Sequence, residues 1–142
     1  EERVVVLSDP VAPEPQEPIA RTQPETPPRG VAPQLVSHLA PRSFEAEQIK
    51  LMRTNILFPV TGKPPRTIMV TSAMPEEGKS FLSANLSVAM AQDINKHVLL
   101  IDCDIRKPST HRYFGIHEPQ GLSDYLTNRS PFAPLIRKTI VD

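Results

Sequence analysis

The sequence predicts an α/β domain built on a parallel β-sheet, preceded by a disordered Pro-rich segment. Nine of the 17 Pro residues lie within residues 1–41, where no apolar periodicity survives. Two short apolar runs follow later, Thr67–Thr71 and His97–Ile101, and neither alternates between apolar and polar residues. A helical pattern lies between these runs. Continuous apolar strands joined through a helix are typical of a parallel sheet covered by helices.

The composition excludes several classes of protein. The 16 basic and 16 acidic side chains among 142 residues give a formal net charge of zero, so we expect no nucleic-acid partner. A single Cys excludes an internal disulfide and a four-Cys zinc site. No apolar run approaches the roughly 20 residues of a membrane helix, and the first residues do not have the pattern of a signal peptide. These features favour a cytoplasmic protein.

Residues 1–42 are predicted to be a Pro-rich linker. Pro, Glu, Gln and Thr dominate this stretch, so residues 1–30 bury too little apolar surface to offset the entropy of ordering. We therefore expect them to be disordered. A Pro-rich ligand for a partner is the alternative to a plain spacer, and we favour the spacer. Val4–Val6 are the one group in this stretch that suits a short strand.

The domain itself is expected to begin with a helix over residues 43–58. Ser43 can cap the free amides of the first turn, and Glu45 and Glu47 suit the positive end of the helix dipole. Apolar residues recur at helical spacing along the segment. Pro59 then ends the helix.

The elements that follow build the sheet. Thr67–Thr71 is predicted to be a buried strand, Ser80–Gln92 a helix, and His97–Ile101 a second buried strand. A short helix is expected over Gly121–Asn128. Thr139–Asp142 suits the start of a third strand.

A phosphate-binding motif lies between the first strand and its helix. The pattern G-x-x-x-x-G-K-[ST] ends at Gly78, Lys79 and Ser80, although Ala73 stands at its first Gly. Gly78 lets the backbone approach a phosphate, Lys79 can reach the β- and γ-phosphates, and the Ser80 hydroxyl can bind Mg²⁺. A chance Gly-Lys-Ser in a strand–helix turn is the alternative. The predicted nucleotide-binding residues are Pro75, Glu76, Glu77, Gly78, Lys79, Ser80 and Phe81.

A second motif follows the second strand. The sequence VLLIDCDIR places Asp102, Asp104 and Arg106 at alternating positions just after the apolar run. Both motifs follow strands of one predicted parallel sheet, so both belong at its carboxyl edge, where open α/β sheets bind ligands. Asp102 can hold Mg²⁺ or its waters, and a carboxylate here can accept a proton from a hydroxyl. The alternative is that Asp102 only caps the strand end and Asp104 pairs with Arg106.

These motifs resemble those of the bacterial tyrosine autokinases (BY-kinases), members of the P-loop ATPase superfamily. The loop TSAMPEEGKS resembles their S-x-x-P-G-E-G-K-[ST] loop, and VLLIDCDIRKPSTHRYFG resembles their apolar strand followed by D-x-D-x-R. GLSDYL and the segment EAEQIKLMRTNI also have counterparts in the family. The resemblance covers residues 43–142, so we expect this part to be the N-terminal portion of a P-loop kinase domain. Glu76 stands where the family usually has Gly, and Lys50 where it has Arg.

The resemblance implies a non-specific protein-tyrosine kinase that uses ATP and Mg²⁺ and controls exopolysaccharide or capsule synthesis and export. Lys79, Asp102, Asp104 and Arg106 would be its catalytic residues, with Ser80 and Asp102 at the metal. Glu47, Lys50 and Arg53 would contact the next subunit of a ring. A membrane polysaccharide co-polymerase would be the other partner and would hold the protein at the inner face of the membrane.

Some features of the family do not occur in this sequence. The strand that supplies a further metal ligand and the tyrosine-rich tail are absent, and the chain starts with Glu. We therefore expect a fragment that is inactive alone. Two other functions stay open, a partition or septum-positioning ATPase and a non-catalytic module that assembles with ATP. The first carries a second Lys where Met74 stands here, and Glu76 gives some weight to the second.

Overall fold

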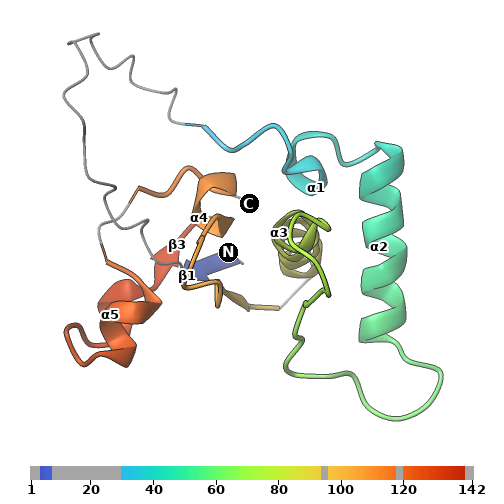
Figure 1. The fold of residues 1–142 in the computed structure, drawn as a ribbon. Helices are drawn as coiled ribbons and strands as arrows, with labels where there is room; N and C mark the ends of the chain where they lie inside the picture. Colours follow the sequence, from blue (N-terminus) through green and yellow to red (C-terminus); the bar gives the residue numbers. More distant parts are fainter. Residues whose placement is uncertain (1–3, 8–29, 94–95, 118–119, 140–142) are drawn as a thin grey trace, which may run out of the picture.

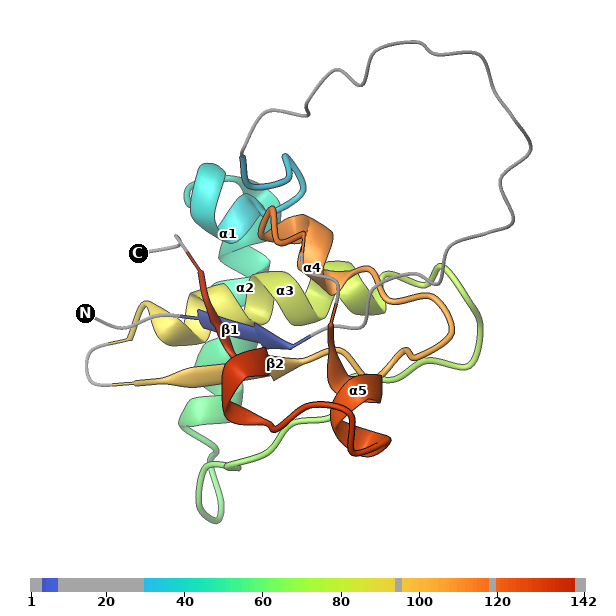
Figure 2. The same cartoon turned by 90° about the vertical axis from the view of Figure 1, so that its left-hand side faces the viewer.

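Helix α3 (Lys79–Ala91) forms the centre of the fold, with a small β-sheet on one side and helix α2 (Phe44–Leu57) on the other (Figure 1). From the sheet side, α3 crosses behind the strands (Figure 2). This computed structural model describes residues 4–7, 30–93, 96–117 and 120–139. The other elements are the strands β1 (Val4–Leu7), β2 (Val98–Ile101) and β3 (Arg137–Lys138), the short helices α1 (Val36–Leu39), α4 (Thr110–Tyr113) and α5 (Leu122–Leu126), and a 3₁₀ turn over Ala133–Leu135.

The sheet is mixed, so the expected α/β architecture is present but the expected all-parallel sheet is not. The strand order is β2-β1-β3. β1 runs parallel to β2, in a register that pairs Val4 with Val98 and Leu7 with Ile101, and antiparallel to β3. The strands expected at Val4–Val6 and within residues 97–101 are confirmed. The third strand begins earlier than expected, before Thr139, and residues 140–142 lie outside the described part of the chain.

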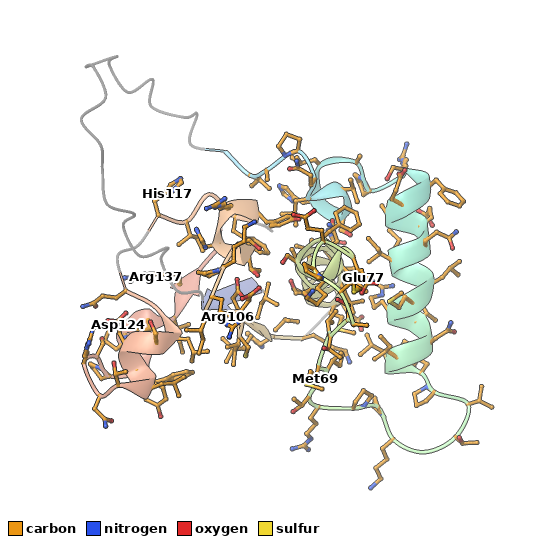
Figure 3. The ribbon with its side chains drawn as sticks, viewed as in Figure 1. Met69, Glu77, Arg106, His117, Asp124 and Arg137 are labelled. Carbon is orange, nitrogen blue, oxygen red and sulfur yellow. The ribbon has the colours of Figure 1, made fainter. Side chains whose placement is uncertain are left out.

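The strand predicted at Thr67–Thr71 does not form. This segment pairs with no strand, and Met69 is 83% exposed and points away from the body of the molecule (Figure 3). A strand needs a neighbour whose amides and carbonyls are free to pair with it. In the described structure β1 takes the parallel place beside β2 that Thr67–Thr71 was expected to occupy. Of the segments expected to be strands, Val4–Val6 and residues 97–101 therefore entered the sheet, and Thr67–Thr71 did not.

Both long helices form where the sequence predicts them, and they share a core. The Ser43 hydroxyl accepts the Ala46 amide at 3.2 Å, so the predicted cap of α2 is confirmed. One side of α3 packs Leu86, Ala89 and Met90 against Ile49 of α2. The other side faces the sheet, α1 and α4 through a second cluster, which consists of Leu35, Ala84, Val88, Ala91 and Phe114, with Val98 and Leu100 of β2 packed against it.

The ordered part of the domain starts before the predicted boundary at residue 42. Leu35 is fully buried, and α1 packs on α3 (Figure 1). The side chain of Asn85, itself fully buried, accepts the Ser37 amide at 2.9 Å and donates to the Gln34 carbonyl at 2.9 Å. These bonds satisfy the backbone of a segment whose composition alone resembles a linker. Residues 8–29 of the predicted linker lie outside the described residues.

Candidate functional site

The phosphate loop, defined here as residues 72–80, has a backbone that two left-handed residues shape. Gly78 has φ of 89° and caps the start of α3, and Glu76 has φ of 63°. Gly adopts this region freely, whereas a residue with a Cβ pays about 1–2 kcal/mol for it. The position where Glu replaces the usual Gly is thus one whose observed conformation favours Gly.

The loop presents unpaired amides in front of a helix. Within the described part of the chain, the amides of residues 76–81 donate to no other group. They stand at the N-terminal end of the 13-residue helix α3, where the helix dipole adds positive potential. Amides arranged in this way bind anionic oxygens such as those of phosphate. The expected nucleotide-binding residues from Pro75 to Phe81 therefore lie together at the start of α3, and the binding of an anion there remains a prediction.

The Lys79 side chain folds back onto its own loop and bonds to two of its residues. Its ammonium donates to the Ser72 hydroxyl at 2.8 Å and to the Met74 carbonyl at 3.3 Å. Both partners are neutral, so a phosphate oxygen offers the ammonium a stronger, charge-assisted bond. Ser72 was not among the predicted site residues. The Ser that opens the S-x-x-P-G-E-G-K-[ST] pattern is its signal in the sequence.

Glu77 fixes the other side of the same turn. Its carboxylate accepts the Met74 amide at 3.0 Å, and the label in Figure 3 places it beside the start of α3. The pKa of this carboxyl is lowered from its usual value, mainly by the bond from the Met74 amide. The Ser72 hydroxyl and the charge of Lys79 lower it further, whereas burial raises it. The ionised Glu77 side chain thus stabilises the turn of the loop through its bond with the Met74 amide.

Asp102 is buried, and both of its carboxylate oxygens accept hydrogen bonds from backbone amides. Only 7% of its surface is exposed, and it begins the aspartate turn, defined here as residues 102–110. One carboxylate oxygen accepts the Asp104 amide at 3.0 Å. The other accepts the amides of Ser109 at 3.0 Å and Thr110 at 2.9 Å, which begin α4. The alternative was that Asp102 only caps the strand end, whereas the structure shows that it caps the start of α4, a helix that the sequence did not predict.

A hydroxyl pair joins the two halves of the site. The Ser109 hydroxyl donates to the Ser80 hydroxyl at 2.9 Å, and the Ser109 amide bonds to Asp102. Ser80 and Asp102, the two predicted metal ligands, are therefore linked through one residue. Ser109 was missed because a Ser between Pro and Thr has no distinctive pattern in the sequence.

Asp104 and Arg106 lie on the exposed side of the aspartate turn. Asp104 accepts the Lys107 amide at 3.0 Å, and Arg106 extends from the exposed part of the turn (Figure 3). Between the residues that the structure describes, no ion pair joins the two. The predicted pairing of Asp104 with Arg106 is therefore not present, and both charges are available to a ligand.

The donor set suits Mg²⁺ rather than a transition metal. In the described ranges, no group of three or more His, Cys, Asp or Glu side chains could hold a metal ion. A hydroxyl and a carboxylate, Ser80 and Asp102, fit a hard cation that takes its other ligands from water and phosphate.

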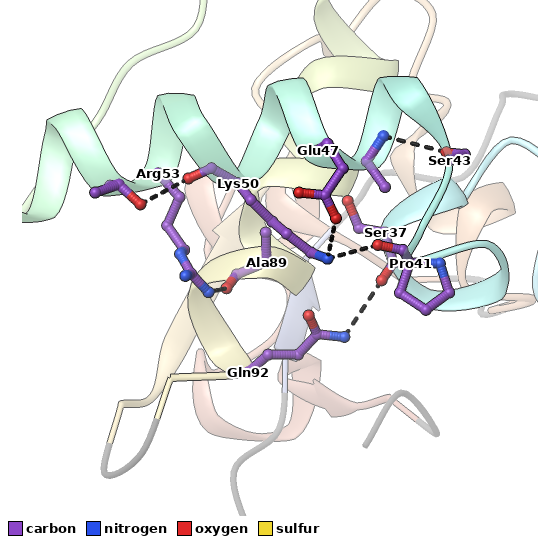
Figure 4. A network of polar contacts seen from close by, with 10 residues as sticks. Ser37, Pro41, Ser43, Glu47, Lys50, Arg53, Ala89 and Gln92 are labelled. Carbon is purple, nitrogen blue, oxygen red and sulfur yellow. Dashed lines mark hydrogen bonds and ion pairs between the residues drawn. The ribbon is translucent and has the colours of Figure 1, made fainter.

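The charged stripe Glu47–Lys50–Arg53 contacts its own chain (Figure 4). Lys50 pairs with Glu47 at 2.8 Å and also donates to the Pro41 carbonyl. Arg53 donates to the Ala89 carbonyl of α3 at 3.0 Å. Glu47 stays mostly exposed, whereas Arg53 is half-buried. The stripe thus ties α2 to α3 and to the segment before it, and the predicted contact with a neighbouring subunit remains a prediction.

The match to one family of known domains spans both halves of the candidate site. The CobQ/CobB/MinD/ParA nucleotide binding domain family matches residues 68–123. No solved structure gives a significant match to this chain. None of the helices among the described residues has the length and apolar character to cross a membrane.

The similar proteins include three bacterial kinases. Tyrosine-protein kinase YwqD of Bacillus subtilis (strain 168) is 42% identical over 96 residues, which are 68% of this chain and 40% of that protein. Tyrosine-protein kinase wzc of Salmonella typhimurium (strain LT2) is 35% identical over 108 residues, 76% of this chain and 15% of that protein. Tyrosine-protein kinase ptk of Acinetobacter johnsonii is 37% identical over 95 residues, 67% of this chain and 13% of that protein. The chain therefore spans less than half the length of these curated relatives.

Proposed function

Because this chain belongs with the bacterial tyrosine-protein kinases by sequence, we propose that it forms the ATP-binding part of a protein-tyrosine autokinase of P-loop type. One observation carries the proposal: an anion-binding loop and a buried carboxylate lie side by side, joined by the 2.9 Å bond between the Ser109 and Ser80 hydroxyls. A phosphoryl-transfer site needs both parts. In such a site the loop binds the phosphates, and the carboxylate binds the metal ion or its waters.

In this proposal the phosphate loop binds the β- and γ-phosphates. The amides of residues 76–81 donate to phosphate oxygens, and Phe81 contributes through its amide alone. Lys79 exchanges its neutral partners, the Ser72 hydroxyl and the Met74 carbonyl, for phosphate oxygens. Glu77 stays on the Met74 amide and keeps the turn in shape while Lys79 moves.

The aspartate turn supports the transfer. Ser80 and Asp102 would hold Mg²⁺, which supplies charge neutralisation to the phosphates when bound. Asp102 or the exposed Asp104 accepts the proton of the attacking tyrosine hydroxyl, and Arg106 stabilises negative charge on the transferred group. Three backbone amides fix the direction of Asp102, which favours a positioned ligand over a mobile base.

The partners and the setting also belong to the proposal. We expect a ring-type homo-oligomer in which γ-phosphate passes to tyrosines of neighbouring subunits, with no nucleic-acid partner. A membrane polysaccharide co-polymerase would hold the protein at the cytoplasmic face of the membrane, where it regulates exopolysaccharide or capsule synthesis and export. For Glu47, Lys50 and Arg53, the exposed Glu47 is the side chain best placed for a subunit contact.

The experiment that tests the site is a nucleotide-binding measurement on the intact protein. Lys79→Met removes the cation from the loop, so affinity for a fluorescent ATP analogue with Mg²⁺ should fall at least tenfold, since a charge-assisted bond is worth roughly 1.5–3 kcal/mol. Lys63→Met, in the exposed connection before the loop, is the matched control. Equal affinity of Lys79→Met and the control would reject the phosphate-loop assignment.

A second measurement separates the kinase from its two rivals. Phosphotyrosine on the intact protein, formed with ATP and lost in Lys79→Met, distinguishes a kinase from an ATPase or an assembly module. Binding and hydrolysis of ATP without phosphotyrosine would favour a partition-type ATPase. Binding with neither hydrolysis nor phosphotyrosine would favour the assembly module.

A further inference from the structure

We propose that Ser109 is a positioning residue for the Mg²⁺ ligand Ser80, and that it acts through its hydroxyl; this inference rests on the proposed function. Ser109 follows D-x-D-x-R in the second motif segment but is not one of the predicted site residues. The structure nevertheless places it between the two residues that would hold the metal.

The geometry around Ser109 is unusual for its position in the chain. Ser109 is the N-cap residue of α4, and a Ser at an N-cap normally accepts an amide from the first turn with its side chain. Here it makes no such bond. Asp102 caps α4 instead, by accepting the amides of Ser109 and Thr110. The Ser109 hydroxyl is thereby released from the usual capping bond.

The released hydroxyl points at Ser80. Ser109 donates and Ser80 accepts, at 2.9 Å. A hydroxyl oxygen has two lone pairs and one proton. The bond from Ser109 takes one lone pair of Ser80 and leaves the second lone pair and the proton of Ser80 for other partners. The free lone pair can bind a cation and the proton can bond to a phosphate oxygen.

Ser109 also couples the two ligands. Its amide holds Asp102 while its hydroxyl holds Ser80, so one residue sets the separation of the two oxygens that would bind Mg²⁺. Groups that orient metal ligands in this way typically change metal affinity by about 10–100-fold when removed. Magnesium demands near-ideal octahedral geometry, which makes a fixed ligand direction useful to it.

The test separates metal binding from nucleotide binding in the intact protein. The fluorescent ATP analogue is titrated first in excess EDTA, and then Mg²⁺ is titrated at a fixed analogue concentration. Ser109→Ala keeps the amide on Asp102 and loses only the hydroxyl. The Mg²⁺ concentration for half-saturation should rise about tenfold, while affinity in EDTA and the melting temperature stay within error of wild type.

Two further variants keep the result interpretable. Ser109→Thr retains a hydroxyl and should restore the wild-type Mg²⁺ requirement, whereas Ser109→Cys keeps the volume with a weak donor and should behave like Ser109→Ala. Ser83→Ala removes a half-buried hydroxyl on the next turn of α3 and should have no effect. If Ser109→Ala and Ser109→Cys keep the wild-type Mg²⁺ requirement, the positioning role is wrong. If wild type binds the analogue no better than Lys79→Met, it is the proposed function that fails.

Discussion

The two halves of the candidate site are built in opposite ways. The phosphate loop is exposed, leaves the amides of residues 76–81 unpaired and holds a non-Gly residue, Glu76, in a left-handed conformation. The aspartate turn buries Asp102 and pairs it with three amides. The loop is therefore open to an anionic ligand, whereas the aspartate turn is held in place by its own backbone amides.

This difference follows from the segment that leads into each half. The aspartate turn continues directly from β2, which is paired with β1 and packed on α3. The phosphate loop continues from Thr67–Thr71, which pairs with no strand and is largely exposed. The phosphate loop therefore takes its shape next to the helix that follows it, whereas the aspartate turn follows a strand that is paired in the sheet.

The largest expected effect is the loss of stability in Asp102→Ala. Three amides, those of Asp104, Ser109 and Thr110, lose their acceptor, and a buried unpaired donor costs about 1–3 kcal/mol. We expect the free energy of unfolding to fall by about 3 kcal/mol in urea titrations. Asp104→Ala, which loses a single exposed bond, is the control and should cost under about 1 kcal/mol. Equal losses in the two variants would show that the buried carboxylate of Asp102 anchors the turn no better than the exposed one of Asp104.

A pair of Pro substitutions tests which apolar segment enters the sheet. Val6→Pro lies in the central strand, so it deletes an amide and leaves a carbonyl unpaired in β2 or β3, at a cost of about 1–3 kcal/mol. Met69→Pro lies in an unpaired, exposed segment and should change stability little. Thermal unfolding of both variants provides the measurement. The reverse order of effects would mean that Thr67–Thr71 is the strand, as its sequence pattern suggests.

The two long helices could be predicted from local sequence, and the sheet could not be predicted fully. Ser43 and its following acidic residues define the start of α2, and Gly78 defines the start of α3, because caps are encoded within a few residues. Which strands pair is decided by segments far apart in the chain. Val4–Leu7 and Thr67–Thr71 carry the same β-branched signal, and nothing local to either says which one lies beside β2.

The site shows the same division. Lys79, Ser80 and Asp102 follow from motifs with fixed spacing. Ser109 and Asn85 do not, because their roles depend on partners 29 and 48 residues away. The helix α4 was also unpredicted, since its cap comes from Asp102 at the end of another element rather than from the residue that precedes it.

A smaller effect is expected from Glu76→Gly, which sharpens the contrast on the loop side. Gly relieves a left-handed conformation worth about 1–2 kcal/mol, but it also raises the entropy of the unfolded chain, so the net gain in stability should be under about 1 kcal/mol. Removal of a carboxylate beside the phosphates should tighten binding of the ATP analogue severalfold. Glu76→Gln keeps the strained backbone and removes only the charge. If Glu76→Gln leaves the affinity unchanged while Glu76→Gly raises it, conformation alone limits the loop.

The smallest expected effect is a pH dependence of the free energy of unfolding that comes from His111. This residue lies on α4, the helix that Asp102 caps. Burial, then the charges of Arg112 and His117, lower the pKa of His111 from its usual 6.5, and the charge of Asp102 opposes them only in part. The Nδ1 atom of this ring is buried without a hydrogen-bond partner among the described residues.

The direction of the pH effect follows from linkage. The unfolded chain takes up a proton on His111 near pH 6.5, whereas the folded protein takes it up only at lower pH, so unfolding is favoured as the pH falls below about 6.5. The stability that the neutral ring contributes is complete above that pH and is lost as the pH falls through the lower, folded pKa.

Urea titrations at a series of pH values from 7.5 downward measure the slope of the free energy of unfolding against pH. The control is His97→Gln, which replaces an exposed ring before β2. His111→Gln should flatten the slope by a fraction of one proton, and His97→Gln should not. A slope that survives in His111→Gln would assign the acid sensitivity to another group, and the aspartate turn would then lose stability with pH no differently from the rest of the fold.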